Sequence, residues 1–389
     1  MPSPTSEDAV NSALQYGAAL LKYISPNDVG LTGSHQCGFY LPKSAWEMYS
    51  PHPPKKGLLA KHQVQVQWQD GRTTESVVTW YGKSTRSEYR LTRFGRDFPF
   101  LTSDEVGSML VIVPRARNDF LAYVLDLEDD IADVQAKLGV EIVDTWAVYR
   151  RDAPATVETE NECIDRQFRE FAGAASKFPA GLEFANRARD TLERCMSDFK
   201  RLPSDDRLMR CIEQEYALFK LVERKLCEPE ICRVFKSVDD FLGTANSILQ
   251  RRKSRAGQSL EHHVEDVLKS AGVPFEPQPR TVDGQPDIII PGADQYHDPK
   301  WPAEKLFVLG VKRTCKDRWR QVLNEAKRVK EKHLLTIQAG ISENQLKEMR
   351  AAQVTLVVPR ELHRKYPPGW GKRLLTVERF VSALRKALM

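Results

Sequence analysis

The sequence is poor in the features that mark membrane, secreted or zinc-binding proteins. It contains no run of eighteen apolar residues, so we expect no membrane-spanning helix. Its first residues, MPSPTSEDAVNSALQYG, include no basic stretch followed by an apolar one, so we expect no secretory signal. The seven cysteines are scattered, and no second Cys or His pair joins Cys227 and Cys232 to complete a zinc site. These absences predict a reduced, cytoplasmic protein.

The chain has the length and the apolar content of a globular protein with more than one domain. Its 389 residues are 41% hydrophobic and 29% charged, which predicts two or three domains. The net charge is only +5, but basic residues gather in three stretches, 83–96, 251–255 and 312–332. The last stretch carries nine basic side chains against three acidic ones. Three such patches favour a polyanionic partner such as nucleic acid, while solvated surface is the alternative for any one of them.

The periodicity divides the chain into a β-rich part and a later α/β part. Between residues 20 and 150, segments such as HQVQVQWQ and ESVVTWYG alternate or are rich in β-branched and aromatic residues, which predicts a many-stranded barrel or sandwich. Helical periodicity begins near residue 178, and a mixed pattern follows residue 257. We therefore predict a mostly β domain over 1–152, a linker over 153–177 and a further domain over 178–389, which is helical over 178–256 and has an α/β core over 257–389.

The α/β part places charged side chains at the ends of two predicted strands. Asp287 opens a strand over 287–291, after the turn-forming sequence GQP. A second apolar strand, over 305–312, ends at Lys312, and a helix is predicted from about 315 to 331. If the two strands pair side by side, Asp287 and Lys312 meet at one edge of the sheet. Glu325 is expected at the edge of the packed face of the helix, where it can point back at the strand ends.

This combination of groups suits metal-dependent hydrolysis of a phosphodiester. Mg²⁺ prefers carboxylate oxygens and water, and Asp287 and Glu325 would supply the carboxylates. The ion would polarise the scissile phosphate and lower the pKa of a bound water, while Lys312 would orient that water and offset transition-state charge. Glu261, on a predicted helix over 258–270, is a third candidate acid, and Glu265 lies one turn along the same helix as its alternative. The ordinary interpretations are a turn aspartate, a solvated lysine and surface glutamates.

A charged sequence after the second strand is suited to reading DNA bases. In CKDRWRQ, the residues Lys316, Asp317 and Arg318 alternate donor, acceptor and donor. That order matches the edges of guanine and cytosine in the major groove. The structural alternative is a charged, capped start of a helix.

These motifs together resemble the EcoRII family of type II restriction endonucleases. The resemblance includes the PD at 286–287, a lysine at 312, TCKDRWRQ and NEA, in that order. It extends to RRKSRAG, YHDPKWPAEKL, VVPRELHRKYP and the N-terminal SPNDVGLTGSHQCGFYLP, so it covers nearly the whole chain. It implies a C-terminal α/β nuclease domain of the PD-(D/E)XK fold, in a variant whose second acid has moved from the strand onto the next helix. That shift would explain why Gly310 stands two residues before Lys312.

The resemblance also implies roles for individual residues. The active-site set, with a tyrosine near it, would be Glu261, Asp287, Lys312, Glu325 and Tyr296. The metal would be held by the three acids of this set. In the same domain, the residues that contact DNA or read G·C pairs would be Lys253, Lys316, Asp317 and Arg318.

The N-terminal half would be a β-barrel-like DNA-binding domain that acts as an effector module. In the family this domain binds a second copy of the recognition site. Its contact residues would carry over onto His35, Tyr40, Lys83, Arg86, Glu88 and Arg90.

The sequence therefore predicts a type II restriction endonuclease that uses Mg²⁺ to cut both strands of double-stranded DNA. The resemblance indicates the site CCWGG and 5′-phosphate ends, and the near-palindromic site predicts a homodimer. A DNA methyltransferase is expected in the same system, with no direct contact implied. Two alternatives stay open, a DNA-binding regulator with an inert nuclease domain and a structure-specific repair nuclease. The complete acid and lysine set argues against the first, and the effector-like half argues against the second.

Overall fold

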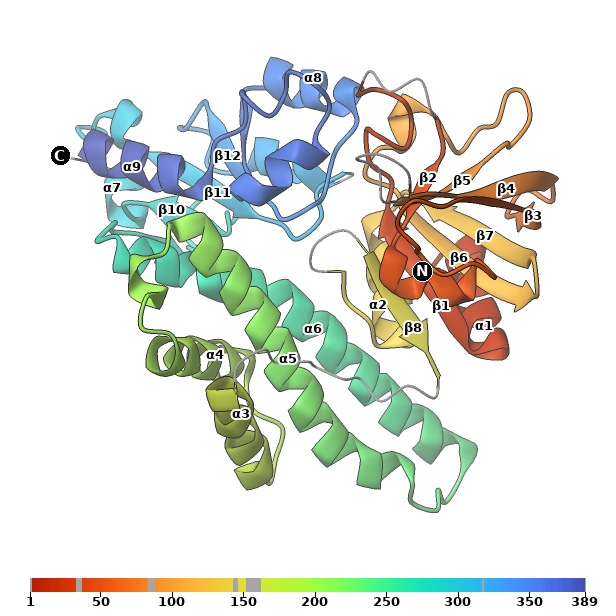
Figure 1. Ribbon diagram of the computed structural model, residues 1–389. Coiled ribbons are helices and arrows are strands. Elements are labelled where there is room, and N and C mark those ends of the chain that lie inside the picture. The colour runs from red at the N-terminus through yellow and green to blue at the C-terminus, as the bar shows by residue number, and fades with distance from the viewer. Residues whose placement is uncertain are drawn as a thin grey trace. The chain divides into compact units, whose positions relative to one another are not determined.

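The computed structural model describes residues 2–32, 37–82, 88–142, 146–151, 162–316 and 318–388 (Figure 1). The chain separates into two compact units. The first consists of Met1–Ala153 with Gln338–Glu348 and Leu362–Arg373, and the second of Pro154–Ile337 with Met349–Glu361 and Leu374–Met389. No helix within the described ranges is long and apolar enough to cross a membrane.

The first unit is built on an eight-stranded sheet within its described residues, as the alternating sequence predicted. The strands follow the order β2-β5-β4-β3-β7-β6-β1-β8 and pair antiparallel except for β3 with β7. Their bounds are β1 Ala18–Tyr23, β2 Phe39–Leu41, β3 Leu59–Trp68, β4 Thr73–Tyr81, β5 Glu88–Thr92, β6 Met109–Ala116, β7 Asp119–Leu125 and β8 Trp146–Arg150.

This sheet has a different core on each face, but the buried strand residues of the second core come only from β1, β6 and β7, and Lys61, Gln63 and Gln65 of β3 are exposed. On one face, aromatic residues such as Trp68 and Phe94 gather in a core that the strands curve around. The other face packs against two helices, α1 (Pro4–Tyr16) and α2 (Glu128–Leu138), which the sequence analysis did not assign. The signals for α1 are present in retrospect. The side chain of Ser3 caps its first turn, and Gly17 ends it with a φ of +78°.

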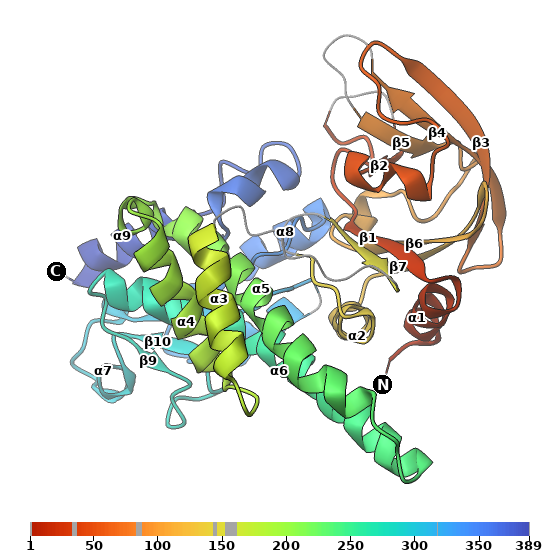
Figure 2. The same ribbon diagram turned by 60° about the horizontal axis from the view of Figure 1, so that its bottom comes forward.

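The second unit begins with a layer of helices, shown in Figure 2 with α5 and α6 side by side. Its members are α3 Glu162–Ala174, α4 Gly181–Cys195, α5 Ser204–Ile231 and α6 Val238–Ser270. α3 falls within the stretch predicted as a linker and packs on α4 and α5 through Phe168. The helix predicted over 258–270 is the last part of α6, which runs without interruption for 33 residues.

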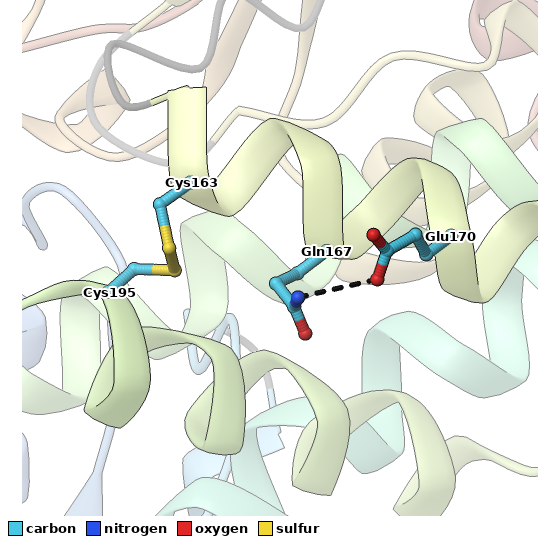
Figure 3. The surroundings of a disulfide bond; sticks show 4 residues. All are labelled: Cys163, Gln167, Glu170 and Cys195. Carbon is cyan, nitrogen blue, oxygen red and sulfur yellow. Dashed lines mark hydrogen bonds between the residues drawn. A yellow bond between two sulfur atoms is a disulfide. The ribbon is translucent and has the colours of Figure 1, made fainter.

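A disulfide joins α3 to α4. Cys163 and Cys195 are bonded across a Cα–Cα distance of 5.7 Å (Figure 3). The expectation that all the cysteines are reduced is therefore wrong for this pair. Their separation of 32 residues gave no signal, because only the packing of α3 against α4 brings them together.

The second unit also contains a mixed five-stranded sheet. Its order is β13-β12-β11-β10-β9, with β11, β12 and β13 parallel and the other pairs antiparallel. The strands are β9 Glu276–Pro277, β10 Ile288–Ile290, β11 Phe307–Val311, β12 Lys332–Leu335 and β13 Val354–Val357. The helices of this region are α7 Ala293–His297 and α9 Val377–Leu388, and α8 Glu343–Ala351 is divided between the two units. These elements match the predicted mixed α/β pattern closely.

One predicted element of this sheet region is wrong. The described residues of 315–331 do not form one helix, because among them only Arg318–Asn324 is helical and that turn is a 3-10 helix, η5. Ala326 then has a φ of +40°, which no right-handed helix can contain. The apolar spacing that predicted a long helix reflects a 3-10 turn followed by an irregular segment with its own buried residues.

Candidate active site

A turn and a strand place Asp287 at one edge of the five-stranded sheet. The turn before it contains Gly284, whose φ of +75° lies in the left-handed region that glycine adopts without steric cost. β10 starts directly after Asp287 and pairs antiparallel with β11, so that Ile288 lies opposite Leu309. The start of β10 therefore lies beside the end of β11.

Lys312 follows β11 and contacts the carboxylate of Asp287. Its Nζ lies 3.1 Å from Oδ1 and 2.9 Å from Oδ2. The backbone N–H of Val311 donates to Oδ2 at 2.7 Å. The structure thus brings together the aspartate and the lysine that the sequence placed at one sheet edge.

The backbone before Lys312 leaves no room for an acidic side chain. A Cβ built on Gly310 would lie 2.8 Å from Cγ1 of Val322 and 3.1 Å from Cδ1 of Leu334. Val322 belongs to η5, the turn that leads to Glu325. The space that a strand acid would fill is therefore occupied by the segment that supplies the acid instead.

Glu325 lies directly after η5 and against the turn that precedes Asp287. A Cβ on Gly284 would lie 2.6 Å from the Cα of Glu325, so the two backbones are in direct contact. The side chain of Glu325 is only 7% exposed, and its Oε2 has no hydrogen-bond partner among the described residues. Burial, and then the charge of Asp287, raise the pKa of Glu325 to about 7, while Lys312 opposes the shift.

The two neighbouring carboxylates fit a hard divalent cation. A buried carboxylate oxygen without a partner is unfavourable, and a cation beside it removes that penalty. Within the part of the chain that the structure describes, no three His, Cys, Asp or Glu side chains form a metal-binding group. Mg²⁺ does not need one, because it is usually held by one or two carboxylates together with water and substrate phosphate. The donor set of Asp287 and Glu325 is of that kind.

Glu261 lies close enough to this pair for their charges to act on it. Its Oε2 accepts a hydrogen bond from Nε2 of Gln278 at 3.1 Å, and the backbone N–H of Gln278 donates to the carbonyl of Asp287 at 2.8 Å. Burial and then Asp287 raise the pKa of Glu261, whereas Lys312 lowers it. Burial also raises the pKa of Glu265, but the opposing charge there is an arginine of α4. The charges of Asp287 and Lys312 thus act on Glu261, whereas Arg189 acts on Glu265.

Tyr296, which the family resemblance placed near the active site, is 7% exposed in α7. Its hydroxyl donates to Oδ1 of Asp283 and accepts from the backbone N–H of Arg328 at 3.3 Å. These partners belong to the segments that carry Asp287 and Glu325. The hydroxyl therefore joins those two segments.

Three further residues hold these segments and were not found from the sequence. Asp283 bonds to the segment after Glu325, and Lys332, at the start of β12, donates from Nζ to the carbonyls of Glu325 and Ala326 at 2.5 and 2.7 Å. Arg328 donates to carbonyls around the end of α7, including that of Asp298 at 2.7 Å. The only sequence signal was the Asp283-Gly284 dipeptide, which marks a turn but not its partner.

The residues predicted to read DNA lie around the start of η5 and on α6. Lys316 is buried, Arg318 is half-buried in η5, and Lys253 is half-buried in α6. Asp317 lies outside the described residues. Lys316 and Arg318 thus stand on the segment that joins Lys312 to Glu325.

Most basic side chains of the second patch, 251–255, form ion pairs within the protein. Three of its four cations, Arg251, Arg252 and Arg255, form ion pairs with glutamates of α5. The shortest joins Nε of Arg252 to Glu223 at 2.6 Å. The expectation of a polyanion-binding patch is therefore wrong for these three arginines, because the stretch crosses the helix–helix contact.

The described effector candidates lie on two paired strands of the first unit. Tyr40 of β2 stands opposite Arg90 of β5, and Nε of Arg90 lies 3.0 Å from the carboxylate of Glu88. Arg90 is only 3% exposed. Burial and then Glu88 raise the pKa of the Tyr40 hydroxyl. The other three candidates lie outside the described residues: His35, Lys83 and Arg86.

A mixed sheet in which adjacent strands join an aspartate to a lysine, with a second acid beside them, defines a nuclease of the PD-(D/E)XK class. Comparison with protein families shows to which family of nucleases the chain belongs. Residues 13–152 match the family described as "Restriction endonuclease EcoRII, N-terminal", and residues 219–381 match "EcoRII C terminal". The chain belongs to the EcoRII family of type II restriction endonucleases and has its two-domain architecture.

Individual relatives agree with this assignment. The chain is 32% identical to the type II restriction enzyme EcoRII of Escherichia coli, over 94% of this chain and 93% of that protein. It is 28% identical to the type II restriction enzyme SsoII of Shigella sonnei, over 34% of this chain and 46% of that protein.

Solved structures of restriction endonucleases are more distant matches. Metal-depleted Ecl18kI in complex with uncleaved, modified DNA aligns with a TM-score of 0.45 at 21% identity, over 57% of this chain and 83% of that one. The PspGI–substrate DNA complex aligns with a TM-score of 0.45 at 16% identity, over 54% and 93%.

Proposed function

We propose that the protein is a Mg²⁺-dependent endonuclease that cuts both strands of DNA at CCWGG and leaves 5′-phosphate ends. The observation that carries the proposal is the juxtaposition of the Asp287–Lys312 pair with Glu325, whose buried Oε2 has no partner among the described residues. The family and the EcoRII relative support the reaction class, and the sequence preference rests on the motif resemblance alone. The domain boundary near residue 152 is part of the same proposal.

Asp287 and Glu325 would hold the metal, with Glu261 beside them. When bound, Mg²⁺ would supply positive charge at the scissile phosphate and favour ionisation of a nearby water. Lys312 would orient the attacking water and offset the charge that builds on the phosphate oxygens. Water then adds to phosphorus as the bond to the 3′ oxygen breaks, so the phosphate stays on the 5′ end. Gln278 would keep Glu261 facing the pair through its 3.1 Å bond.

Contacts to the bases would come from the segment between Lys312 and Glu325. Lys316, Asp317 and Arg318 would read the G·C pairs of the site in the major groove. Because Lys316 is buried in the structure, its side chain would have to turn outward on DNA. Lys253 on α6 would contact the phosphate backbone.

The first unit would bind a second copy of the site. Tyr40, Glu88 and Arg90 support this role by standing together on β2 and β5, and His35, Lys83 and Arg86 would complete the surface. Arg90, which is buried against Glu88, would position that glutamate more than contact DNA directly. The near-palindromic site calls for a homodimer. A cognate methyltransferase would protect host DNA without binding this protein.

A plasmid digest tests the proposal. Unmethylated plasmid with several CCWGG sites is incubated with Mg²⁺ and wild-type, Lys312→Ala or Lys300→Ala protein, and the cut ends are sequenced. Wild type and the Lys300→Ala control, which removes an exposed lysine outside the site, should give discrete fragments ending at CCWGG. Lys312→Ala and EDTA should abolish them. Absence of wild-type cutting would indicate an inert DNA-binding regulator, and random nicks would indicate a structure-specific nuclease.

A further inference from the structure

Glu325 is held in place by a loop and not by a regular element. The 3-10 helix η5 ends at Asn324, and β12 begins only at Lys332. A residue in such a segment has no helix or strand ladder to fix it, so specific bonds must do so. The carboxylate itself supplies little anchorage, since Oε2 has no partner among the described residues. The position of Glu325 therefore depends on what holds the backbone that follows it.

Asp283 makes three bonds that hold this backbone. Its carbonyl accepts from the backbone N–H of Ala326 at 2.7 Å, and its Oδ2 accepts from the backbone N–H of Lys327 at 2.8 Å. Its Oδ1 accepts from the hydroxyl of Tyr296. These bonds begin one residue after Glu325. One residue thus captures the two successive N–H groups that follow the acid.

The captured backbone is in a conformation that needs such support. Ala326 has a φ of +40°, and a non-glycine residue in this region costs of order 1 kcal/mol or more. Besides Asp283, the buried Lys332 holds it, donating to the carbonyls of Glu325 and Ala326. Strain of this kind persists only where the surroundings determine the backbone. Bonds from both sides meet that condition here.

Asp283 also lies in the turn that leads into Asp287. Three residues lie between the two, and Gly284, next to Asp283, packs its backbone against Glu325. Asp283 is an exposed residue, so its side chain fills no part of the apolar core. Its bonds therefore fix the spacing between the two carboxylates more than they stabilise the fold.

We propose that Asp283 is a positioning residue that sets Glu325 beside Asp287 and so completes the cation site. The inference rests on the proposed function, because it assumes that Asp287 and Glu325 share the metal. Asp283 itself is not a ligand in this scheme. Both oxygens of its carboxylate accept hydrogen bonds, from Tyr296 and from Lys327. Asp283 therefore acts on the site through the backbone of residues 325–327.

The test compares Asp283→Ala with Asp283→Asn and with Asp294→Ala, which removes an exposed acid at α7 as a matched control. Single-turnover cleavage of a CCWGG duplex by the full-length protein is measured over a range of Mg²⁺ concentrations. Ca²⁺ binding to the protein–duplex complex is measured by calorimetry, and the melting temperature is recorded. Outer partners of metal ligands typically contribute about 10–100-fold to metal affinity or activity.

Asp283→Ala should weaken Ca²⁺ binding and raise the Mg²⁺ requirement by about tenfold or more, with metal-free DNA binding and melting temperature near wild type. Asp283→Asn should recover most of the loss, because its oxygen can accept from Lys327 while its amide donates to Tyr296. Asp294→Ala should behave as wild type. Should Asp283→Ala fail to fold, Tyr296→Phe decides, since it removes the hydroxyl that bonds to Asp283 and to the N–H of Arg328 and keeps the ring packed; weaker Ca²⁺ binding supports the proposal.

Wild-type Ca²⁺ affinity in Asp283→Ala, or in Tyr296→Phe if that variant decides, would overturn the inference. So would equal losses in Asp283→Ala and Asp294→Ala. Glu325→Gln in the same series separates this failure from that of the proposed function. If Glu325→Gln loses Ca²⁺ binding and Asp283→Ala does not, only the positioning role is wrong. If Glu325→Gln keeps wild-type binding and cleavage, the proposed site itself is wrong.

Discussion

Two glutamates buried in the second unit have opposite environments. Glu215 of α5 is fully buried against α6, and Glu325 lies at the sheet edge and is 7% exposed. Burial alone would raise the pKa of both carboxyl groups. The pKa of Glu215 is nevertheless lowered, whereas that of Glu325 rises to about 7.

The partners of each carboxylate explain the difference. His263 Nε2 lies 2.8 Å from Glu215, Ser259 donates to it at 2.9 Å, and Arg255 lies 3.4 Å away. These contacts outweigh the effect of burial on the pKa of Glu215. Glu325 faces the negative charge of Asp287, and its Oε2 lacks a hydrogen bond within the described ranges. A satisfied buried charge is part of the architecture, whereas we propose that the unsatisfied one at the sheet edge binds a cation.

The largest expected effect is on cleavage by Glu325→Gln. The change keeps the shape of the side chain and removes the charge that would hold the cation, so the cleavage rate should fall by about 10²–10³-fold or more. Single-turnover cleavage at saturating Mg²⁺ measures it. Glu331→Gln, in the same segment but exposed and bonded to Thr355, is the matched control and should cut at the wild-type rate. Equal cleavage rates for the two variants would contradict the role of Glu325 as a metal ligand.

Glu215→Ala should affect stability. The variant leaves Arg255 buried without its counter-charge and His263 without its acidic neighbour, which typically costs about 3–5 kcal/mol. Urea unfolding followed by circular dichroism gives the free energy. Glu213→Ala, an exposed acid two residues earlier on α5, should change it by less than about 0.5 kcal/mol. A loss below about 1 kcal/mol for Glu215→Ala would show that the helical network is not a stabilising unit.

The stability difference between Glu325→Gln and wild type should grow with pH, because the pKa of Glu325 is raised in the folded protein. In the unfolded chain the glutamate ionises near 4.5 and in the metal-free fold at about 7, so wild type loses stability as the pH rises through this window. Glutamine does not titrate. The variant should match wild type below pH 4.5 and be more stable by roughly 3 kcal/mol well above pH 7. Urea unfolding in EDTA at several pH values checks this, and a difference that does not vary with pH would contradict it.

The smallest expected effect is the difference in cleavage rate between variants of Glu261 and Glu265, the two acids on α6. Glu261→Gln should reduce the cleavage rate by about tenfold, because the charges of Asp287 and Lys312 act on this residue. Glu265→Gln should stay within about twofold of wild type, because its main charged neighbour is an arginine of α4. Single-turnover rates of both variants are compared. The reverse order would assign the third acid to Glu265.

Much of the sheet in the second unit could be predicted from the periodicity of the sequence and the order of its strands. The strands β10 to β13 and the meeting of Asp287 with Lys312 follow from apolar runs, turn residues and antiparallel pairing. The position of Glu325 does not follow in the same way. A long helix was expected around it, and the structure has a 3-10 turn and a residue with positive φ. Such segments are set by tertiary bonds, and the sequence spacing carries no trace of them.

The second feature that the sequence could not predict is which partners the charged residues bind. The arginines at 251, 252 and 255 read as a patch for a polyanion, but α5 provides glutamates that neutralise them. Asp283 was not singled out from the sequence, but it bonds to a backbone more than forty positions away. Charge and spacing show what a side chain can do. The contact that it makes depends on which elements pack together.

The most direct measurement is the proton release that accompanies metal binding. Mg²⁺ is titrated by calorimetry near pH 7, in two buffers of different ionisation enthalpy, into wild-type and Glu325→Gln protein. Because the pKa of Glu325 is about 7, wild type should release about half a proton per bound ion more than the variant and bind the ion more tightly. Equal affinity and equal proton release in the two proteins would show that Glu325 does not hold the metal.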